Sequence, residues 1–577
     1  MRQRAFGHAG ATGRFGAVIG HIGFLAGLLL ALPAPEAARA SYPVLTSVSP
    51  HAGAPGKTFA VKFSGKLDGV GRRVWCDDPA LVFTLPDAEG NATLSIAGDA
   101  QPGMRLVRFV NAEGATAPVR FTVGTLPLME EKEPNDEREG AQPVPQLPAW
   151  ILGQFDKAGD VDGYAVTLKK NVPLFVRLDA YTLTSTVDAH VQIVDPGGSV
   201  VMTASDGRNL DPECTFVPPS DGVYVVRVAG FAMPPGTDVG FTGGPGKVYQ
   251  LTLSTGPLVT HVFPAAVPLS GKSAVELRGV GMKGTAVREE VSATPLPGSE
   301  DLGLVLPKGA ASPIDVVRAR HPIQTPPVDA AGEPAKVEVP VVLGGQIPSP
   351  GREVVYAFEM KKGEKLRARL WSKTLGLNLD ASLRISGPTG AQIASADMGA
   401  DVFSDPGVSW TAGVDGRYTL AVADLMKRSG AGFEFVVEIC PPAPACSITL
   451  ADGKPLRVEV GKTTNLKAKV VLSDGWKEPL VARLHGLPAG VHASEVAVPD
   501  KGGDVDFTLR AAANAPAASS AVRVELWTKA DPPSFLSAAY SVRADLRRGH
   551  SSSDFATDVW ISVVLPGTPP PPAPTKK

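Results

Sequence analysis

The sequence predicts an all-β protein, built as a tandem array of β-sandwich modules. Three observations lead to this fold class. Glycine and proline are abundant, 62 and 54 of 577 residues, which favours turns over long helices. Apolar and polar residues alternate over runs of five to eight residues, as in strands with one buried face. Segments of the chain also recur at a spacing of more than one hundred residues, as expected for repeated domains.

The alternating runs are short and are separated by turn sequences. Apolar side chains occupy every second position in runs such as 164–168, 174–178, 249–253, 366–370, 433–439 and 505–509. Asp-Pro-Gly-Gly at 195–198 and Asp-Gly pairs at 221, 415 and 452 lie between runs, and these residues form tight turns. Strands at this spacing predict antiparallel sandwiches.

The repeats divide the chain into alternating modules. Gly163-Tyr164-Ala165-Val166 recurs 192 residues later as 355–358, and Asp221-Gly222-Val223-Tyr224 recurs 194 residues later as 415–418. The boundaries that we predict are a signal peptide (1–40), short module 1 (41–125), long module 1 (126–255), short module 2 (256–330), long module 2 (331–440), a terminal module (441–565) and a Pro-rich tail (566–577).

The first forty residues have the pattern of a secretory signal peptide. Three arginines precede an apolar stretch from about Phe15 to Leu32, and Ala38-Arg39-Ala40 follows as a cleavage sequence. An uncleaved membrane anchor is the alternative interpretation. No later segment is apolar for long enough to span a bilayer. We therefore expect a secreted, periplasmic or cell-surface protein.

The long modules resemble a known family. Glu131 to Asp136, then Gly159 to Tyr164, then Asp221 to Tyr224 resemble the bacterial pre-peptidase C-terminal (PPC) domain, a jelly-roll-like β-sandwich appended to many exported bacterial proteins. A weaker copy of the pattern covers long module 2. The short modules resemble immunoglobulin-like TIG domains, and the terminal module is expected to be immunoglobulin-like as well.

The resemblance implies a calcium site in long module 1. In collagen-binding relatives of the PPC family, acidic residues at matching positions hold Ca²⁺ and order the N-terminal linker. The candidate ligands in this chain are Glu131, Glu133, Asn135, Asp136, Asp160 and Asp162.

The residues themselves are compatible with such a site. Glu131, Glu133 and Asn135 are spaced so that their side chains point the same way in an extended segment, and Asp160 and Asp162 form a second such pair. Clustered oxygen ligands suit Ca²⁺ better than Zn²⁺ or Mg²⁺. The alternative is that the acidic run is a solvated linker and that Asp160 and Asp162 belong to a turn.

Long module 2 lacks these acidic residues. Where Asp160 and Asp162 stand in long module 1, the second copy has Arg352 and Val354. We therefore expect long module 2 to fold without metal.

Cysteine usage leaves two interpretations open. Cys440 and Cys446 enclose five residues, of which three are proline. They form a local disulfide in an oxidising compartment, or the proline-rich spacer keeps them apart as free thiols. Cys76 and Cys214 lie in different modules, and we expect each to be a small buried side chain.

No catalytic motif stands out in the sequence. The histidines are not in zinc-protease spacing, and there is no Gly-x-Ser-x-Gly elbow. The net charge of −2 gives no electrostatic case for nucleic-acid binding.

We expect an exported, non-catalytic protein for binding, adhesion or envelope structure, with an extracellular protein or polysaccharide as partner. The alternatives are an accessory or inhibitory partner of a secreted hydrolase, or a carbohydrate-binding protein.

Overall fold

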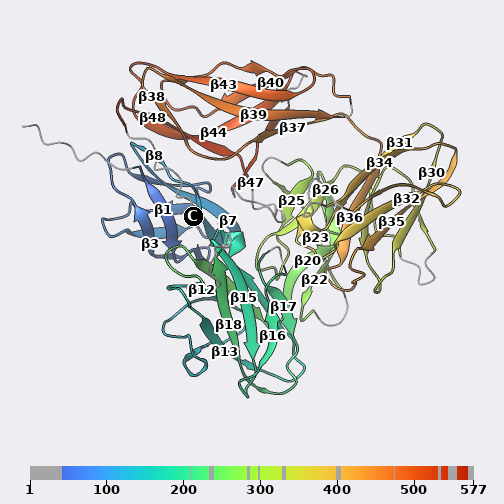
Figure 1. Ribbon diagram of the computed structural model, residues 1–577, viewed down its shortest axis with the longest axis horizontal. Helices are drawn as coiled ribbons and strands as arrows, with labels where there is room; N and C mark the ends of the chain where they lie inside the picture. The colour runs from blue at the N-terminus through green and yellow to red at the C-terminus, as the bar shows by residue number, and fades with distance from the viewer. Residues whose placement is uncertain are drawn as a thin grey trace, which may run out of the picture. The chain divides into compact units, whose positions relative to one another are not determined.

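The computed structural model describes residues 42–568, apart from 208–209, 233–239, 283–285, 297–298, 328–332, 398–404, 474, 530–533 and 543–554. The predicted signal peptide and residues 569–577 of the predicted tail lie outside this part of the chain. The described residues form strands β1 to β48 and three short 3₁₀ helices, η1 to η3 (Figure 1). The prediction of an all-β array of sandwich modules is confirmed.

Short module 1 consists of two sheets with the strand orders β1-β3-β6-β5 and β2-β9-β7-β4. Strand β8 extends the second sheet by pairing with β7. The apolar side chains of Phe63, Phe109 and Phe121 fill the space between the sheets. The strands are β1 (Val44–Ser49), β2 (Ala52–Gly53), β3 (Thr58–Lys66), β4 (Arg73–Cys76), β5 (Leu81–Phe83), β6 (Asn91–Ile96), β7 (Gly103–Asn111), β8 (Gly114–Ala115) and β9 (Val119–Val123).

Long module 1 has two five-stranded sheets with the orders β10-β12-β19-β14-β17 and β11-β13-β18-β15-β16. The helices are η1 (Arg138–Gly140) and η2 (Tyr181–Leu183). The strands are β10 (Leu128–Glu130), β11 (Gln142–Pro143), β12 (Ala149–Gln154), β13 (Asp162–Leu168), β14 (Leu174–Asp179), β15 (Val187–Val194), β16 (Val200–Ala204), β17 (Glu213–Phe216), β18 (Gly222–Ala232) and β19 (Val248–Ser254).

Long module 2 repeats this topology strand for strand, with the orders β27-β29-β36-β31-β34 and β28-β30-β35-β32-β33. Its edge strand β27, at residues 323–324, precedes the predicted boundary at 331, so long module 2 begins earlier than predicted and includes the segment just before this strand. Helix η3 (Lys373–Leu375) stands where η2 stands in the first copy. The strands are β27 (Ile323–Gln324), β28 (Ala335–Lys336), β29 (Val341–Gln346), β30 (Val354–Met360), β31 (Lys365–Trp371), β32 (Ala381–Ser386), β33 (Gln392–Ala396), β34 (Gly407–Thr411), β35 (Gly416–Asp424) and β36 (Glu434–Cys440).

Short module 2 has a three-stranded and a four-stranded sheet, β20-β22-β23 and β21-β26-β25-β24. Its apolar cluster includes Val342 and Val436 of long module 2, so the two modules share a packed surface. The strands are β20 (Leu258–Phe263), β21 (Ala266–Pro268), β22 (Ser273–Val280), β23 (Val287–Val291), β24 (Thr294–Pro295), β25 (Leu302–Val305) and β26 (Ile314–Ala319).

The terminal module pairs the sheet β37-β39-β43-β41 with a sheet built around β38-β48-β44-β40-β42. Strand β45 pairs with β44, and β46 pairs with β47. The strands are β37 (Ala445–Leu450), β38 (Leu456–Glu459), β39 (Thr463–Ser473), β40 (Leu480–His485), β41 (Val491–His492), β42 (Val496–Ala497), β43 (Gly503–Ala511), β44 (Ala518–Thr528), β45 (Phe535–Ser537), β46 (Tyr540–Ser541), β47 (Phe555–Ala556) and β48 (Asp558–Val564).

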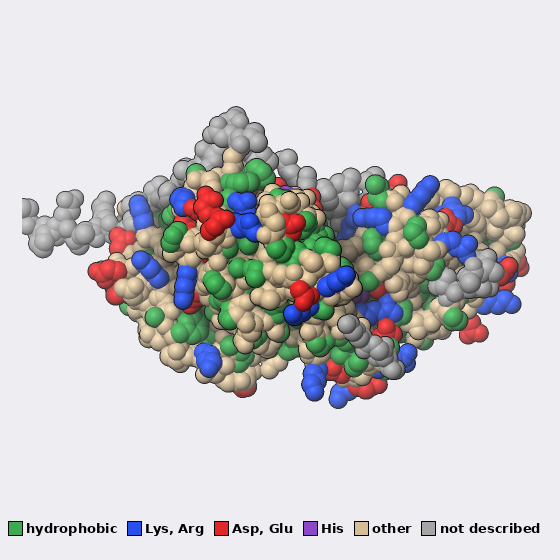
Figure 2. All heavy atoms as spheres, turned by 90° about the horizontal axis from the view of Figure 1, so that it is seen from below, with side chains coloured by type: hydrophobic (Ala, Val, Ile, Leu, Met, Phe, Trp, Pro, Cys, Tyr) green, Lys and Arg blue, Asp and Glu red, His purple; other side chains and the backbone are tan. Residues whose placement is uncertain are grey.

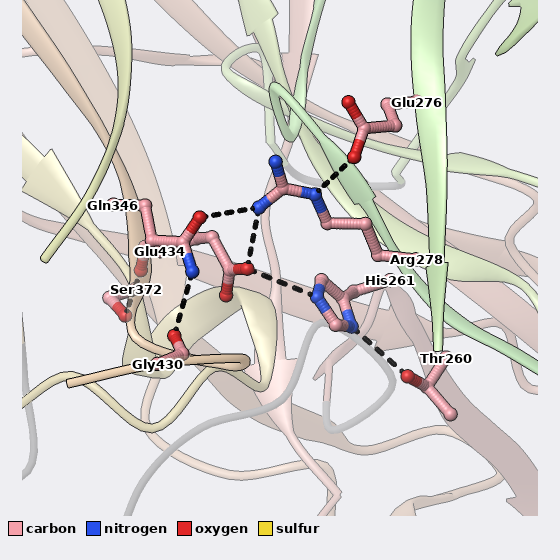
Figure 3. Close-up of polar contacts among 8 residues, drawn as sticks. All are labelled: Thr260, His261, Glu276, Arg278, Gln346, Ser372, Gly430 and Glu434. Carbon is pink, nitrogen blue, oxygen red and sulfur yellow. Dashed lines mark hydrogen bonds and ion pairs between the residues drawn. The ribbon is translucent and has the colours of Figure 1, made fainter. Parts of the chain in front are cut away.

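Polar side chains connect short module 2 to long module 2 (Figure 3). Glu434, at the start of β36, accepts a hydrogen bond from Arg278 Nη1 at 2.8 Å and lies 3.3 Å from His261 Nε2. Arg278 also contacts Gln346 and Glu276, each at 2.9 Å. Burial opposes the charge on Glu434, but His261 and Arg278 outweigh it and lower the pKa of this carboxyl group. These charged side chains therefore join the two modules through ion pairs and hydrogen bonds.

Short module 1 contacts both long module 1 and the terminal module. The buried His51 ring lies with Nε2 3.0 Å from the carbonyl oxygen of Tyr249. Arg108 donates from Nη2 to Tyr540 Oη at 3.1 Å. The rings of Trp75 and Trp560 meet edge to face, with centroids 5.4 Å apart.

The surface carries charges of both signs. On the face drawn in Figure 2, lysine and arginine side chains are interspersed with aspartate and glutamate. This mixture agrees with the small net charge of the sequence. Among the described residues, no helix has the length and apolar character needed to cross a membrane.

The four cysteines are free thiols. Cys440 ends β36 in long module 2, whereas Cys446 lies within β37 of the terminal module and pairs with Leu472 of β39. Of the two interpretations of this pair, the structure shows free thiols.

Candidate metal centre

The acidic run at 131–136 lies against the start of strand β13. The peptide N–H of Glu131 donates to Leu152 O at 2.9 Å, which continues the pairing of β10 with β12. The N–H of Gly163 donates to Asn135 O at 3.1 Å. These two bonds bring the run next to the loop that carries Asp160 and to the first residue of β13, Asp162.

Four carboxylates meet at this place. Each of them offers an oxygen atom within 4.8 Å of an oxygen of the others. Two come from the acidic run and two from the loop and strand that follow it: Glu133, Asp136, Asp160 and Asp162. Like charges this close repel one another strongly at low dielectric unless a cation or a proton compensates.

Several oxygens at the site are buried and have no hydrogen-bond partner. They are Oδ1 of Asn135, Asp136, Asp160 and Asp162. Asn135 is 1% exposed, and Asp160 and Asp162 are 0% exposed. Buried polar atoms are almost always satisfied in folded proteins. Four buried acceptors without a hydrogen bond in one cluster, of which Asp160 Oδ1 has only a 3.5 Å ion pair with Lys157, therefore fit a site that receives a cation.

Two tyrosines enclose the deep end of the cluster. Tyr249 Oη lies 2.6 Å from Asp162 Oδ2 and 2.9 Å from Glu131 Oε1. Tyr164 Oη lies 2.5 Å from Tyr249 Oη and 3.2 Å from Glu131 Oε1. Burial, followed by the Glu131 charge, raises the pKa of Asp162. A bound cation would oppose this rise by stabilising the carboxylate form.

A lysine lies at the solvent-exposed end of the acidic cluster. Lys157 Nζ is 3.0 Å from Asp136 Oδ2 and 3.5 Å from Asp160 Oδ1. Its side chain is 61% exposed, so it can swing into solvent at little cost. One ammonium group offsets only part of the charge of the carboxylates. The lysine and a bound cation would compete for the same oxygens.

The donor set selects the kind of metal. All of the converging atoms are carboxylate or amide oxygens, and no sulfur or imidazole nitrogen takes part. Oxygen-only ligation from flexible segments suits Ca²⁺, whereas Zn²⁺ prefers sites that include nitrogen or sulfur. The residues present fit Ca²⁺.

The candidate ligands do not play equal parts. Glu133, Asn135, Asp136, Asp160 and Asp162 surround the cluster. The carboxylate of Glu131 instead accepts hydrogen bonds from the two tyrosines, from Asn135 Nδ2 at 3.3 Å and from the Gln154 N–H at 2.8 Å. It is placed to hold the ligands in position rather than to bind metal.

The tyrosines are the site residues that sequence reasoning missed. Tyr164 and Tyr249 were read only as apolar positions of alternating strands. A tyrosine on the inner face of a strand needs a partner for its hydroxyl group. That need was the available signal for a polar group inside this sandwich.

Long module 2 has lost the whole arrangement. Asp160 and Asp162 are replaced by Arg352 and Val354. Strand registers place Phe435 where Tyr249 stands, and Pro326 where Glu131 stands. Tyr356, the equivalent of Tyr164, keeps its hydroxyl group buried without a hydrogen-bond partner, and burial raises its pKa.

Comparison with known proteins gives only general likeness. No family model matches the sequence, and no curated protein matches it. Solved structures that align with it include Escherichia coli alpha-2-macroglobulin activated by porcine elastase, at 12% identity over 89% of this chain and 43% of that chain, with a TM-score of 0.14. Another is the Bacteroides ovatus glucan-locus protein SGBP-B in complex with a mixed-linkage heptasaccharide, at 10% identity over 69% of this chain and 76% of that chain, with a TM-score of 0.14.

The ICAM-5 D1–D4 ectodomain fragment aligns at 12% identity over 85% of this chain and 97% of that chain, with a TM-score of 0.11. The chain spans less than half the length of the first two proteins found, alpha-2-macroglobulin and tripeptidyl peptidase 2. These neighbours are multi-domain β proteins, and at such scores they carry no argument about function.

Proposed function

We propose that the chain is an exported, non-catalytic binding or envelope-structural protein in which Ca²⁺ orders long module 1, a PPC-like domain. The observation that carries the proposal is the cluster of buried oxygens without hydrogen bonds at Asn135, Asp136, Asp160 and Asp162. The same sandwich recurs in long module 2 without these side chains, so the fold itself does not require them.

The ion would act close to the connection between modules. Strand β10, which pairs with β12, is the first strand of long module 1 after short module 1, and the acidic run directly follows it. A cation shared by Asp136, Asp160 and Asp162 would fix this segment to the sandwich. It would thereby stabilise the edge of long module 1 into which short module 1 leads, as suits a protein that presents binding surfaces along an array.

The test is a calcium titration of the full chain by calorimetry, with melting temperatures measured in calcium and in chelator. We expect saturable binding and a stabilisation of about 2.7 kcal/mol at a free calcium concentration of one hundred times Kd. Asp160→Asn should remove both effects. Glu353→Gln, a carboxylate change in the corresponding loop of long module 2, is the matched control and should leave both unchanged.

Two results would contradict the calcium site: no saturable binding by the unchanged chain, or binding that survives Asp160→Asn. Circular dichroism of the variant in chelator checks that it is folded. A second measurement follows from the raised pKa of Asp162. Calcium binding should release a proton near neutral pH, which calorimetry in buffers of different ionisation enthalpy detects.

A further inference from the structure

A second group of metal-ligating side chains lies in long module 2, away from the acidic cluster. Val437 and Ile439 of β36 point into the core of the sandwich, so Glu438 and Cys440 share the opposite face of the strand. His321 lies two residues before β27, the edge strand of the same sheet. A ring nitrogen, a carboxylate oxygen and the thiol sulfur of these three residues lie within 4.8 Å of one another.

The place is enclosed but can be reached from solvent. Cys440 is 4% exposed, whereas the His321 and Glu438 side chains are 29% and 12% exposed. His321 Nε2 lies 3.9 Å from Glu438 Oε1. Zinc bonds of about 2.0–2.3 Å place tetrahedral ligand atoms roughly 3.5 Å apart, so modest side-chain rotations would close the three atoms around one ion.

The donor set differs in kind from that of the acidic cluster. It combines nitrogen, sulfur and oxygen, which suits Zn²⁺ and excludes Ca²⁺ as the preferred ion. Three protein ligands leave a fourth position for water. This ligand count is that of an open rather than a closed zinc centre.

The two long modules provide an internal comparison. Strand registers place Leu126, Thr252 and Ser254 of long module 1 where His321, Glu438 and Cys440 stand in long module 2. None of those three can form such a site. The sheet does not need a ligating side chain at any of these positions, yet the second copy has one at all three.

A neighbouring charge favours the thiolate. Arg367 of β31 pairs with Cys440 across the sheet. Burial, together with the Glu438 charge, raises the pKa of the Cys440 thiol to about 11, and Arg367 opposes that rise. Beside a bound cation, the Arg367 guanidinium group would help to hold Cys440 as a thiolate.

We propose that His321, Glu438 and Cys440 form a binding site for Zn²⁺ or a similar borderline-soft divalent ion on the outer face of long module 2. The inference is independent of the calcium site. It uses other residues and another donor chemistry, and it lies in the copy that has lost the acidic cluster.

The test is a titration of the full, reduced chain with Co²⁺ and with Zn²⁺ in excess calcium, so that calcium occupies the oxygen-only cluster. Cobalt should bind at one site with the intense near-ultraviolet band of a thiolate–cobalt bond, and zinc should displace it. Cys440→Ser and His321→Ala should each abolish the band. Cys446→Ser is the matched control and should preserve it.

Serine occupies the equivalent position, Ser254, in long module 1, so Cys440→Ser should fold normally, and melting in the absence of metal checks this. Absence of the thiolate band in the unchanged chain would overturn the proposal. A band that persists in Cys440→Ser and disappears in Cys446→Ser would also overturn it, as would zinc binding that only Asp160→Asn removes.

Discussion

Tyr164 and Tyr356 occupy equivalent positions in the two long modules, but their hydroxyl groups have different surroundings. Tyr164 Oη contacts Tyr249 and Glu131, whereas Tyr356 Oη is buried without a hydrogen-bond partner. Tyr164→Phe should destabilise its module by about 1–2 kcal/mol, because it leaves buried polar partners unsatisfied. Tyr356→Phe should be neutral or stabilising. Urea denaturation of both variants measures the difference, and equal effects would contradict it.

His51 is a single residue with a defined pH dependence. It is buried, and burial lowers its pKa from 6.5 to about 4. Below pH 6.5 the unfolded chain takes up a proton that the folded chain does not, so stability falls as the pH drops from 6.5 to about 4. The full loss is roughly 3 kcal/mol.

His51→Gln should reduce this pH dependence, because glutamine cannot take up a proton and can still donate to the Tyr249 carbonyl. The measurement is the unfolding free energy of both proteins at pH 7 and pH 5. If the unchanged protein and the variant lose the same stability between these pH values, the neutral buried His51 is not the cause.

At the residue scale, the sequence predicted the carboxylates of the acidic cluster. It did not predict the contacts of Glu131 with the tyrosines, which position these carboxylates. The spacing of Asp160 and Asp162 and the acidic run indicated oxygen ligands. It could not show that Glu131 would turn toward Tyr249, because that contact joins residues 118 positions apart in sequence. The group of His321, Glu438 and Cys440 was not predicted from the sequence for the same reason. Glu438 and Cys440 lie on β36, whereas His321 lies more than one hundred residues earlier, before β27, and only the folded sheet brings them together.

At the scale of a strand, glycine controls how closely an aromatic ring approaches the backbone. Gly153 pairs with Tyr249, and Gly345 pairs with Phe435 in the second copy. A Cβ at Gly153 would lie 2.2 Å from Tyr249 Cζ, and one at Gly345 would lie 2.3 Å from Phe435 Cζ. Both contacts are too short, so alanine would displace the ring.

Gly153→Ala should therefore weaken calcium binding without changing any ligand, because the displaced Tyr249 hydroxyl no longer supports Asp162 and Glu131. Gly345→Ala should destabilise long module 2 by about 1–3 kcal/mol and leave calcium binding unchanged. Calorimetry and denaturation of the two variants separate these effects. Undiminished calcium affinity in Gly153→Ala would show that the ring does not position the ligands.

Strand positions were largely predictable, since alternation reports which face of a strand is buried. One feature that both long modules share was not predicted. It is an aspartate that binds the N–H groups of a turn. Asp211 accepts from the N–H groups of Ala180, Tyr181 and Thr182, each at 2.8 Å. Asp405 binds the corresponding turn in the second copy. The Asp-Pro pairs at 211 and 405 recur 194 residues apart and were the available signal, but a carboxylate that caps a turn from a distant loop leaves no periodic pattern.

At the scale of the whole molecule, the contact between the first and last modules depends on Trp560. This residue is 1% exposed, and its ring meets Trp75 and lies 5.2 Å from the Arg73 guanidinium carbon. Trp560→Ala should release the terminal module from short module 1 and speed hydrogen exchange in β4. Trp527→Ala, which removes a ring stacked on Phe535 within the terminal module, is the control and should leave β4 protected. Unchanged exchange in Trp560→Ala would show that this ring does not hold the modules together.

The contacts of short module 1 with the terminal module also determine what happens when a protease cuts the chain between modules. The segment between Cys440 and Ala445 is the sole covalent link from long module 2 to the terminal module. Side-chain contacts such as Arg108 with Tyr540 join the same terminal module to the start of the chain. A single cut in that segment would therefore yield a nicked protein whose two fragments still migrate together under native conditions and separate only in denaturant.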